Sequence, residues 1–183
     1  MNLAVFLDRD GVINEAIVRN GKPYPPAKVE DLVFPSGTFE AICSIRSSGY
    51  LVVVVTNQPD VAKGIQSKDT VEAIHGMIRR QLQVDDIKVC YHVDEDNCNC
   101  RKPKPGMILD AAKEYTIDLT RSYLIGDRWR DIEAGKAAGC KTILVQPKIA
   151  YNETQAQGMD ATVGSLYEAA TIILNNTIDK KGG

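Results

Sequence analysis

The chain has 183 residues, of which 44% are hydrophobic and 25% are charged, and its formal net charge is −2. These values describe an ordinary globular chain of one domain, and they exclude the basic footprint of a nucleic-acid-binding protein. No apolar run is long enough to span a bilayer, and Asp8 interrupts the N-terminal apolar stretch too early for a signal peptide. We therefore expect a cytoplasmic protein with reduced cysteines and with no membrane or nucleic-acid partner. The sequence shows no dimer interface, so we expect a monomer.

Short β-branched segments alternate with amphipathic segments along the chain. The expected strands cover residues 3–8, 50–57, 87–92, 122–127 and 141–146. The expected helices lie near residues 37–48, 67–82, 105–116, 129–138 and 164–176. The run VVVV at 52–55 has no polar alternation, as expected of a parallel strand that is covered on both faces. This order predicts an α/β fold with a parallel sheet, built as one domain over residues 1–176, with a frayed tail at 177–183.

Two segments, residues 11–36 and 93–104, have neither a helical nor a strand pattern. Each comes directly after an expected strand. Ligands bind outside the carboxyl ends of the strands in open α/β sheets. We therefore expect these two segments to lie beside the functional site.

The first strand ends in the sequence LDRDG, which carries two carboxylates. Asp8 and Asp10 are two residues apart, so an extended chain would point both side chains the same way. Two carboxylates at the end of a strand are costly unless a cation joins them, and oxygen ligands favour Mg²⁺. A capped turn at the end of the strand is the alternative interpretation of this short motif.

Two further pairs of polar residues lie at the ends of expected elements. The second strand ends in Thr56 and Asn57, whose hydroxyl and amide groups can hydrogen-bond an anionic oxygen. Arg101 and Lys102 offer two cations just before a helix. A local turn of the backbone is the alternative for the first pair, and a solvated charge pair is the alternative for the second.

Three cysteines and a histidine fall within eleven residues, in the spacing C-x-H-x5-C-x-C. The four residues are Cys90, His92, Cys98 and Cys100. Each Cys or His pair shares a face at period two, so two such pairs facing each other predict a tetrahedral structural Zn²⁺ site. Such a site would fix the backbone that carries the neighbouring Arg101 and Lys102. Unligated thiols in a loop are the alternative.

Two other features near this cluster have simpler interpretations. We expect the acidic run at 94–96 to be a solvated loop tip, because three thiolates favour a softer ion than carboxylates do. We expect His75, which lies in an amphipathic stretch, to be a helix-surface or partly buried residue. A zinc-stapled interaction module without catalysis is the remote alternative for the whole chain.

The fourth strand ends in GDRWRD. Asp127 lies at the strand end, and Asp131 lies four residues on, one turn into the next helix, so both can face one pocket. Carboxylates that stabilise a helix N-terminus are the alternative. The order acid, hydroxyl, lysine and acid at successive strand ends is more specific than any one of these motifs.

This order resembles the motif order of the haloacid dehalogenase (HAD) superfamily of phosphotransferases. DRDG resembles its first motif, TN its second, RKPKPG its third and GDRWRD its fourth, and the match runs over residues 3–146. The resemblance implies a Rossmann-like sheet in which the five expected strands have the order 5-4-1-2-3. Only about 40 residues separate the first two strands, so we expect no cap domain.

The resemblance also implies catalytic roles. Asp8 would be the nucleophile that forms an aspartyl-phosphate, and Asp10 would be the general acid and base. Thr56 and Lys102 would bind the phosphoryl oxygens that do not contact the metal.

The implied cofactor is Mg²⁺, in addition to the structural Zn²⁺. Asp8, the backbone carbonyl of Asp10, and Asp127 would hold the Mg²⁺. Asp131 would orient these ligands without being one itself.

Within the superfamily, DRDGVIN, VTNQ, the zinc loop before RKPKPGM and GDRWRDIEAG resemble the heptose bisphosphate phosphatases. Histidinol-phosphate phosphatases share this plan and are the alternative. The resemblance implies removal of the 7-phosphate from a heptose 1,7-bisphosphate, in surface-polysaccharide synthesis. Arg101 is the main candidate for binding the second phosphate of such a sugar bisphosphate. The further substrate-binding candidates are Asn57, Arg128 and Lys63.

Overall fold

The computed structural model describes residues 1–178, which form an α/β fold around one parallel six-stranded sheet. Its strands are β1 (Leu3–Leu7), β4 (Tyr50–Asn57), β5 (Asp86–Cys90), β6 (Tyr123–Gly126), β7 (Lys141–Val145) and β8 (Ala161–Val163). The helices are α1 (Thr38–Ser47), α2 (Lys68–Leu82), α3 (Gly106–Tyr115), α4 (Trp129–Ala138) and α5 (Leu166–Ile178). Each lies within a few residues of its expected position.

The strand order is β5-β4-β1-β6-β7-β8. The five strands expected from the sequence correspond, in chain order, to β1, β4, β5, β6 and β7, and they have the predicted order 5-4-1-2-3. The short strand β8 was not predicted, and it extends the sheet beyond β7. Strand β1 pairs with β4 on one side and with β6 on the other. The chain reverses its direction of winding at β1, so the carboxyl ends of these three strands are neighbours.

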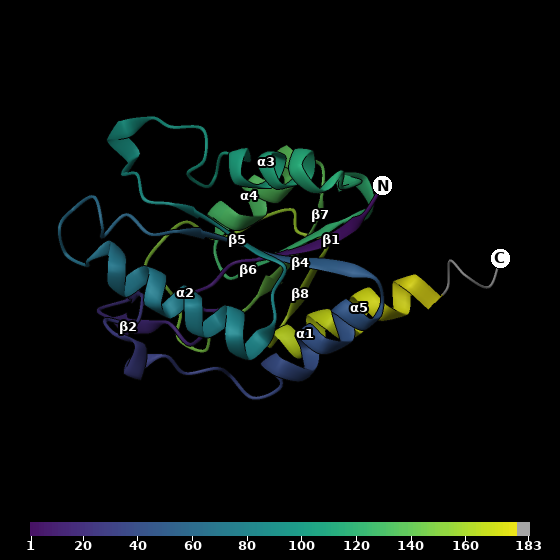
Figure 1. The fold of residues 1–183 in the computed structure, drawn as a ribbon, viewed down its shortest axis with the longest axis horizontal. Helices are drawn as coiled ribbons and strands as arrows, with labels where there is room; N and C mark the ends of the chain where they lie inside the picture. Colours follow the sequence, from purple (N-terminus) through teal and green to yellow (C-terminus); the bar gives the residue numbers. More distant parts are fainter. Residues whose placement is uncertain (179–183) are drawn as a thin grey trace.

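Helices cover both faces of the sheet, with α3 and α4 on one side and α1, α2 and α5 on the other (Figure 1). Strand β4 shows how the sequence produces this arrangement. Val52 and Val54 belong to the hydrophobic cluster under α1 and α2, whereas Val53 and Val55 belong to the cluster under α3 and α4. A strand that is apolar at every position is therefore buried on both faces, as predicted.

The prediction that residues 11–36 lack regular structure was wrong. Strands β2 (Ile17–Arg19) and β3 (Lys22–Tyr24) form an antiparallel hairpin, and a short 3₁₀ helix, η1 (Val29–Asp31), follows them. The hairpin turns at Asn20 and Gly21, which both have positive φ angles. Asn-Gly is the strongest local signal for a two-residue hairpin turn, so the sequence did carry this information.

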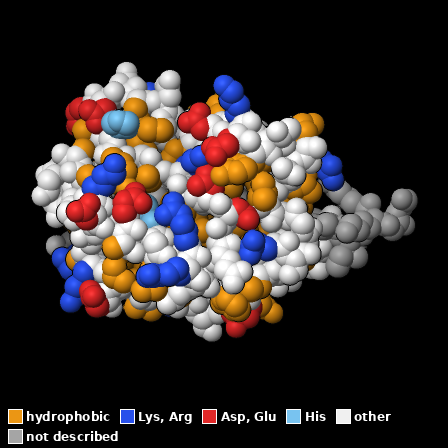
Figure 2. Space-filling view, viewed as in Figure 1, with side chains coloured by type: hydrophobic (Ala, Val, Ile, Leu, Met, Phe, Trp, Pro, Cys, Tyr) orange, Lys and Arg blue, Asp and Glu red, His pale blue; other side chains and the backbone are white. Residues whose placement is uncertain are grey.

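The remaining segments are short. Two more 3₁₀ helices, η2 (Asp94–Asp96) and η3 (Leu119–Arg121), lie in connections between the main elements. Helix α5 continues through Ile178, and residues 179–183 of the predicted tail lie outside the described residues. Across residues 1–178, no helix combines the length and the apolar character needed to cross a membrane. Acidic and basic side chains are interspersed over the face shown in Figure 2.

Candidate active site

Three carboxylates meet at the carboxyl edge of the sheet. Asp8 follows β1, Asp127 follows β6, and Asp131 lies in the first turn of α4, and all three are buried. One oxygen from each lies within 4.8 Å of the others. Burial raises the pKa of Asp8 to about 6, and burial together with the charges of Asp8 and Asp131 raises the pKa of Asp127 well above its usual value. Such a cluster is unfavourable unless cations neutralise it.

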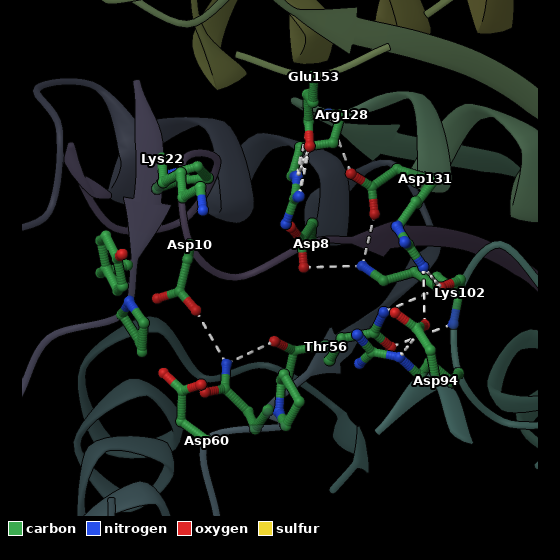
Figure 3. A pocket seen from close by; sticks show the side chains of 18 of the residues that line it. Asp8, Asp10, Lys22, Thr56, Asp60, Asp94, Lys102, Arg128, Asp131 and Glu153 are labelled. Carbon is green, nitrogen blue, oxygen red and sulfur yellow. Dashed lines mark hydrogen bonds and ion pairs between the residues drawn. The ribbon is translucent and has the colours of Figure 1, made fainter. Parts of the chain in front are cut away.

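Lys102 supplies one of these cations (Figure 3). Its Nζ donates to Asp8 Oδ1 at 2.8 Å and to the carbonyl of Val55 at 2.7 Å, and it lies 2.5 Å from Asp131 Oδ1. Burial acts to lower the pKa of Lys102, but the charges of Asp131 and Asp8 outweigh it and raise this pKa. The lysine therefore stays protonated and pairs with two of the three carboxylates.

The carboxylate of Asp127 shows where a second cation fits. Its Oδ2 accepts a hydrogen bond of 2.6 Å from the Tyr151 hydroxyl, whereas its Oδ1 is buried and has no hydrogen-bond partner among the described residues. A buried carboxylate oxygen without a partner, in a group of oxygen donors, suits a hard divalent ion such as Mg²⁺. The residues present therefore fit the predicted Mg²⁺ site.

Asp131 supports its neighbours with both oxygens. Oδ1 contacts Lys102, and Oδ2 accepts a hydrogen bond of 3.1 Å from the backbone N–H of Arg128. The predicted role of Asp131 in orienting the Mg²⁺ ligands stays a prediction. The predicted role of the Asp10 carbonyl as a Mg²⁺ ligand stays a prediction.

The carboxylate of Asp10 is held by side chains that the sequence reasoning missed. Arg9, which is completely buried, contacts both of its oxygens, with an Nη2–Oδ2 distance of 2.8 Å and an Nε–Oδ1 distance of 3.1 Å. Asn14 and Gln58 also donate to it, at 3.0 Å and 2.9 Å. Burial acts to raise the pKa of Asp10, but the charge of Arg9 and these hydrogen bonds outweigh it and lower this pKa.

The expectation that His75 is a helix-surface or partly buried residue was wrong, because its side chain is completely buried beside Arg9. Its Nε2 lies 3.1 Å from Arg9 Nη1. A guanidinium can only donate, so His75 Nε2 accepts and the ring is neutral with its proton on Nδ1. Burial and the charge of Arg9 lower the pKa of His75 to about 4. His75 lies four residues after the buried Val71, so helical spacing was the signal that could have found it.

Thr56 and Asn57, at the end of β4, make different contacts in the site. Thr56 is buried, lines the site, and accepts a hydrogen bond of 2.9 Å from Gln58, which leaves its own hydroxyl proton free to donate. Asn57 uses its side-chain amide and oxygen on the backbone carbonyl and N–H of Lys102, both at 3.1 Å. Asn57 therefore braces the third motif, and its predicted contact with substrate stays a prediction.

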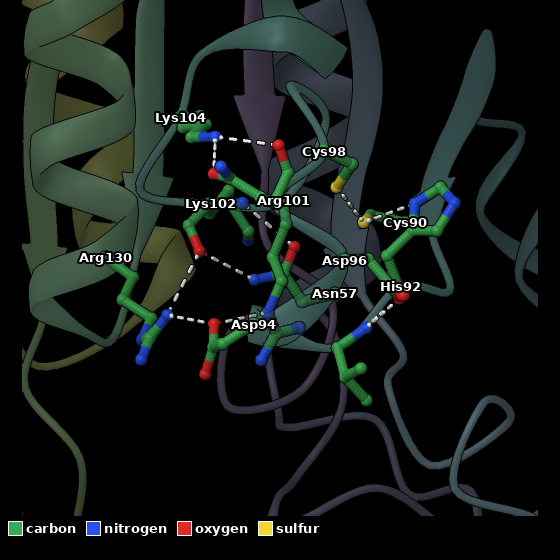
Figure 4. Close-up of polar contacts among 12 residues, drawn as sticks. Asn57, Cys90, His92, Asp94, Asp96, Cys98, Arg101, Lys102, Lys104 and Arg130 are labelled. Atoms are coloured by element: carbon green, nitrogen blue, oxygen red, sulfur yellow. Dashed lines mark hydrogen bonds and ion pairs between the residues drawn. The ribbon is translucent and has the colours of Figure 1, made fainter.

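The four predicted Zn²⁺ ligands converge, and their ligand atoms lie within 4.8 Å of one another. Figure 4 shows Cys90, His92 and Cys98 side by side. The sulfur of Cys90 lies 3.7 Å from that of Cys98 and 3.1 Å from that of Cys100. His92 Nδ1 lies 3.6 Å from the Cys90 sulfur and 3.3 Å from the Cys100 sulfur. Tetrahedral ligands about 2.3 Å from one ion are separated by comparable distances, so this set fits Zn²⁺.

The acidic run at 94–96 is exposed, as predicted for a solvated loop tip, but Asp94 also pairs with two arginines. Its Oδ1 accepts hydrogen bonds from Arg101 Nε at 2.7 Å and from Arg130 Nη1 at 3.1 Å. Asp94 thereby links the loop of the Cys/His cluster to Arg101 and to helix α4. The main candidate for binding a second phosphate is held in place by a carboxylate of that loop.

All predicted catalytic residues line or border one cleft of about 520 Å³. Strand β3 and the segment before α2, which carries Lys63, form part of its wall. Arg128 also lines the cleft, but Glu153 holds its guanidinium, with Nε–Oε distances of 2.8 Å and 3.0 Å. Neither Tyr151 nor Glu153 was predicted to belong to the site.

Known proteins with similar sequences have consistent names. A HAD-hydrolase-like family matches residues 99–169. The D-glycero-β-D-manno-heptose-1,7-bisphosphate 7-phosphatase of Rhodopseudomonas palustris is 41% identical over 148 residues, which cover 74% of this chain and 79% of that protein. The protein of the same name from Helicobacter pylori is 39% identical over 150 residues, which cover 79% of this chain and 83% of that protein.

A solved structure of a protein with a similar name superimposes on this chain. The crystal structure of the D,D-heptose 1,7-bisphosphate phosphatase from B. bronchiseptica, complexed with magnesium and phosphate, superimposes with a TM-score of 0.81. It is 32% identical, and the match covers 96% of this chain and 99% of that one. The chain thus belongs to the HAD-like hydrolases, and within them to the family of the D-glycero-D-manno-heptose-1,7-bisphosphate 7-phosphatases.

Proposed function

We propose that this protein is a Mg²⁺-dependent phosphatase that removes the 7-phosphate of D-glycero-D-manno-heptose 1,7-bisphosphate in surface-polysaccharide synthesis. The observation that carries this proposal is the buried cluster of Asp8, Asp127 and Asp131, in which Lys102 pairs with Asp8 and Asp131 and one oxygen of Asp127 has no hydrogen-bond partner among the described residues. The names of the relatives supply the substrate, including its β anomer.

In the first half of the reaction, a carboxylate oxygen of Asp8 attacks phosphorus, and the bond from phosphorus to the sugar oxygen breaks. Asp10 gives its proton to the leaving oxygen, and an aspartyl-phosphate forms on Asp8. In the second half, Asp10 takes a proton from a water molecule that attacks phosphorus, and Asp8 is released with inorganic phosphate.

Lys102 and Thr56 stabilise the phosphoryl group during both steps. Lys102 already contacts Asp8 at 2.8 Å, so its ammonium lies beside the oxygens that gain charge. Asp8, Asp127 and the carbonyl of Asp10 would hold Mg²⁺. When bound, this ion supplies the positive charge that lets an anionic phosphate approach an anionic nucleophile.

Asp10 must carry a proton when the sugar leaves, although Arg9 lowers its pKa. An incoming phosphate dianion opposes the effect of Arg9, because a nearby negative charge raises the pKa of a carboxyl group. We propose that substrate binding itself therefore loads Asp10 with its proton.

We further propose that the Cys/His cluster holds one structural Zn²⁺ and that the protein works as a monomer in the cytoplasm. All four ligand positions of the cluster come from the chain, so no position remains for a water nucleophile. The cysteines of the cluster form no disulfide in the described part of the chain, which suits a reducing compartment.

A substrate panel with phosphate release as the readout tests the proposal. It contains both anomers of heptose 1,7-bisphosphate, histidinol phosphate and simple hexose phosphates, ranked by kcat/KM. We expect the β anomer to rank first, and a higher rank for histidinol phosphate would favour the alternative family. We also expect Asp8→Asn to reduce turnover at least about 10³-fold, because it removes the nucleophile. Full turnover in this variant would rule out the mechanism.

A further inference from the structure

Three consecutive residues after β7, which we call the 151–153 segment, each contact a different part of the site. The Tyr151 hydroxyl donates to Asp127 Oδ2 at 2.6 Å. The backbone N–H of Asn152 donates to the carbonyl of Gly21, in the turn of the β2–β3 hairpin, at 2.7 Å. Glu153 accepts hydrogen bonds from the guanidinium of Arg128. The chain is therefore anchored at the two residues directly after Tyr151.

The environment of Asp127 makes its two oxygens unequal. Oδ2 lies against the backbone of Gly11, because a Cβ atom built on that glycine would come within 1.9 Å of it. The same Cβ would lie 3.1 Å from the Tyr151 hydroxyl oxygen, so Gly11 and Tyr151 enclose Oδ2 together. Oδ1 is buried and without a hydrogen-bond partner in the described part of the chain. One oxygen is thus fixed by the protein and the other is available to a cation.

The chemistry of a phenol suits this task. At neutral pH a tyrosine hydroxyl carries its proton and donates to a carboxylate, without adding a charge that would repel a cation. A lysine or arginine in its place would compete with the ion for the same carboxylate. Removing a side chain that contacts a metal ligand, but not the metal itself, commonly weakens metal binding about 10–100-fold.

We propose that Tyr151 is a positioning residue for the divalent cation: its hydroxyl fixes one oxygen of Asp127 so that the other faces the ion. Asn152 and Glu153, the next two residues, anchor the chain that carries Tyr151. This inference rests on the proposed Mg²⁺ site, and it adds to that site a residue from outside the four motifs.

The test measures Mg²⁺ binding directly. Wild-type protein and Tyr151→Phe are titrated with Mg²⁺ alone in a calorimeter, without substrate. We expect the Mg²⁺ Kd of the variant to rise about 10-fold or more, because phenylalanine keeps the ring and loses only the donor. We expect the KM for substrate at saturating Mg²⁺ to stay within about twofold, since no substrate contact is removed.

Tyr167→Phe is the matched control. Tyr167 is exposed on α5, so this substitution removes the same hydroxyl group away from the site. Thermal unfolding of both variants in chelator shows whether a loss of affinity comes from a loss of folding. If Tyr151→Phe binds Mg²⁺ as tightly as the wild type, the positioning role is overturned and the proposed function stands. If the wild type itself binds no Mg²⁺, the proposed function fails and the role of Tyr151 fails with it.

Discussion

Arg9 lies between the two aspartates of the first motif, and its side chain is completely buried. Moving a guanidinium out of water costs several kcal/mol unless its donors are paired. Asp10 and His75 provide that pairing, on opposite ends of the guanidinium. A buried pair of this kind is weak evidence for stability, but it fixes the side-chain geometry of Asp10. The proposed role of Asp10 as general acid requires such a fixed geometry.

We predict that His75→Phe destabilises the protein by about 2 kcal/mol and lowers kcat about 10-fold, while KM changes little. Phenylalanine leaves a buried N–H of Arg9 without an acceptor, and Arg9 then no longer holds Asp10 firmly. His75→Gln keeps an acceptor and should recover most of both losses. Urea unfolding and steady-state kinetics measure these effects, with the exposed Arg80→Ala on the same helix as control. Equal losses in the Phe and Gln variants would contradict the role of the hydrogen bond.

We predict that removing the ammonium group of Lys102 has opposite effects on Mg²⁺ affinity and on turnover. Its ammonium stabilises Asp8 and Asp131, and it also repels a second cation. Lys102→Met should therefore bind Mg²⁺ more tightly than the wild type, although kcat falls about 10²-fold or more because a donor to the phosphoryl group is lost. The neighbouring Lys104→Met, which removes an exposed lysine, is the control for both measurements. Weaker Mg²⁺ binding in Lys102→Met would contradict this view of the site.

At the scale of elements, hydrophobic periodicity was sufficient to predict the main strands and helices. Strand β4 and helix α2 show why: each buries a regular set of apolar residues, and this regularity is visible in the sequence. Strand β8 has only three residues at the edge of the sheet, so it leaves no comparable pattern.

The site was predictable only where its residues belong to motifs at strand ends. Asp8, Asp127 and Lys102 converge because parallel strands bring their carboxyl ends to one edge. Tyr151 reaches Asp127 from a segment with no regular structure, 24 residues further along the chain. No local pattern announces such a contact, because it depends on how the chain returns over the sheet after β7.

The loop that carries the Cys/His cluster positions Arg101 through Asp94 and through the covalent link to Cys100. We predict that Cys98→Ser loses its Zn²⁺, measured by elemental analysis, and raises KM several-fold because Arg101 is no longer held. Cys43→Ser, which changes an exposed cysteine on α1, should retain about one Zn²⁺ per chain. Unchanged kinetics in a zinc-free Cys98→Ser protein would show that the loop does not act through its metal.

For the whole molecule, the buried site couples folding to protons and to metal. Without Mg²⁺, Asp8 has a pKa of about 6 in the folded protein, against an ordinary value of 3.8. The folded state then binds more protons than the unfolded chain between these values, so stability falls as the pH rises through about 4 to 6. The pKa of His75 is lowered from 6.5 to about 4, so the sign is opposite and stability falls as the pH drops through this window.

At the proposed site, Mg²⁺ would separate these two contributions, because it would neutralise the carboxylates without contacting His75. Its stabilising effect should therefore grow with pH, as protons stop competing for Asp8 and Asp127. At pH 7.5 and about 100 times the Kd, we expect about 2.7 kcal/mol, which raises Tm by roughly 5–10 °C, and we expect less than half of this increase at pH 5. Thermal unfolding with Mg²⁺ and with chelator at both pH values measures the difference.

Two variants make this prediction specific. Asp127→Asn removes one of the buried charges, so it should unfold at a higher temperature than the wild type in chelator and gain nothing from Mg²⁺. His75→Gln should keep the full Mg²⁺ effect and lose the drop in stability below about pH 6, because glutamine does not titrate. A Mg²⁺ effect that is equal at pH 5 and pH 7.5, or that persists in Asp127→Asn, would mean that the ion stabilises the protein elsewhere. The carboxylate cluster is therefore expected to reduce stability in the metal-free protein and to increase it only when the ion is bound.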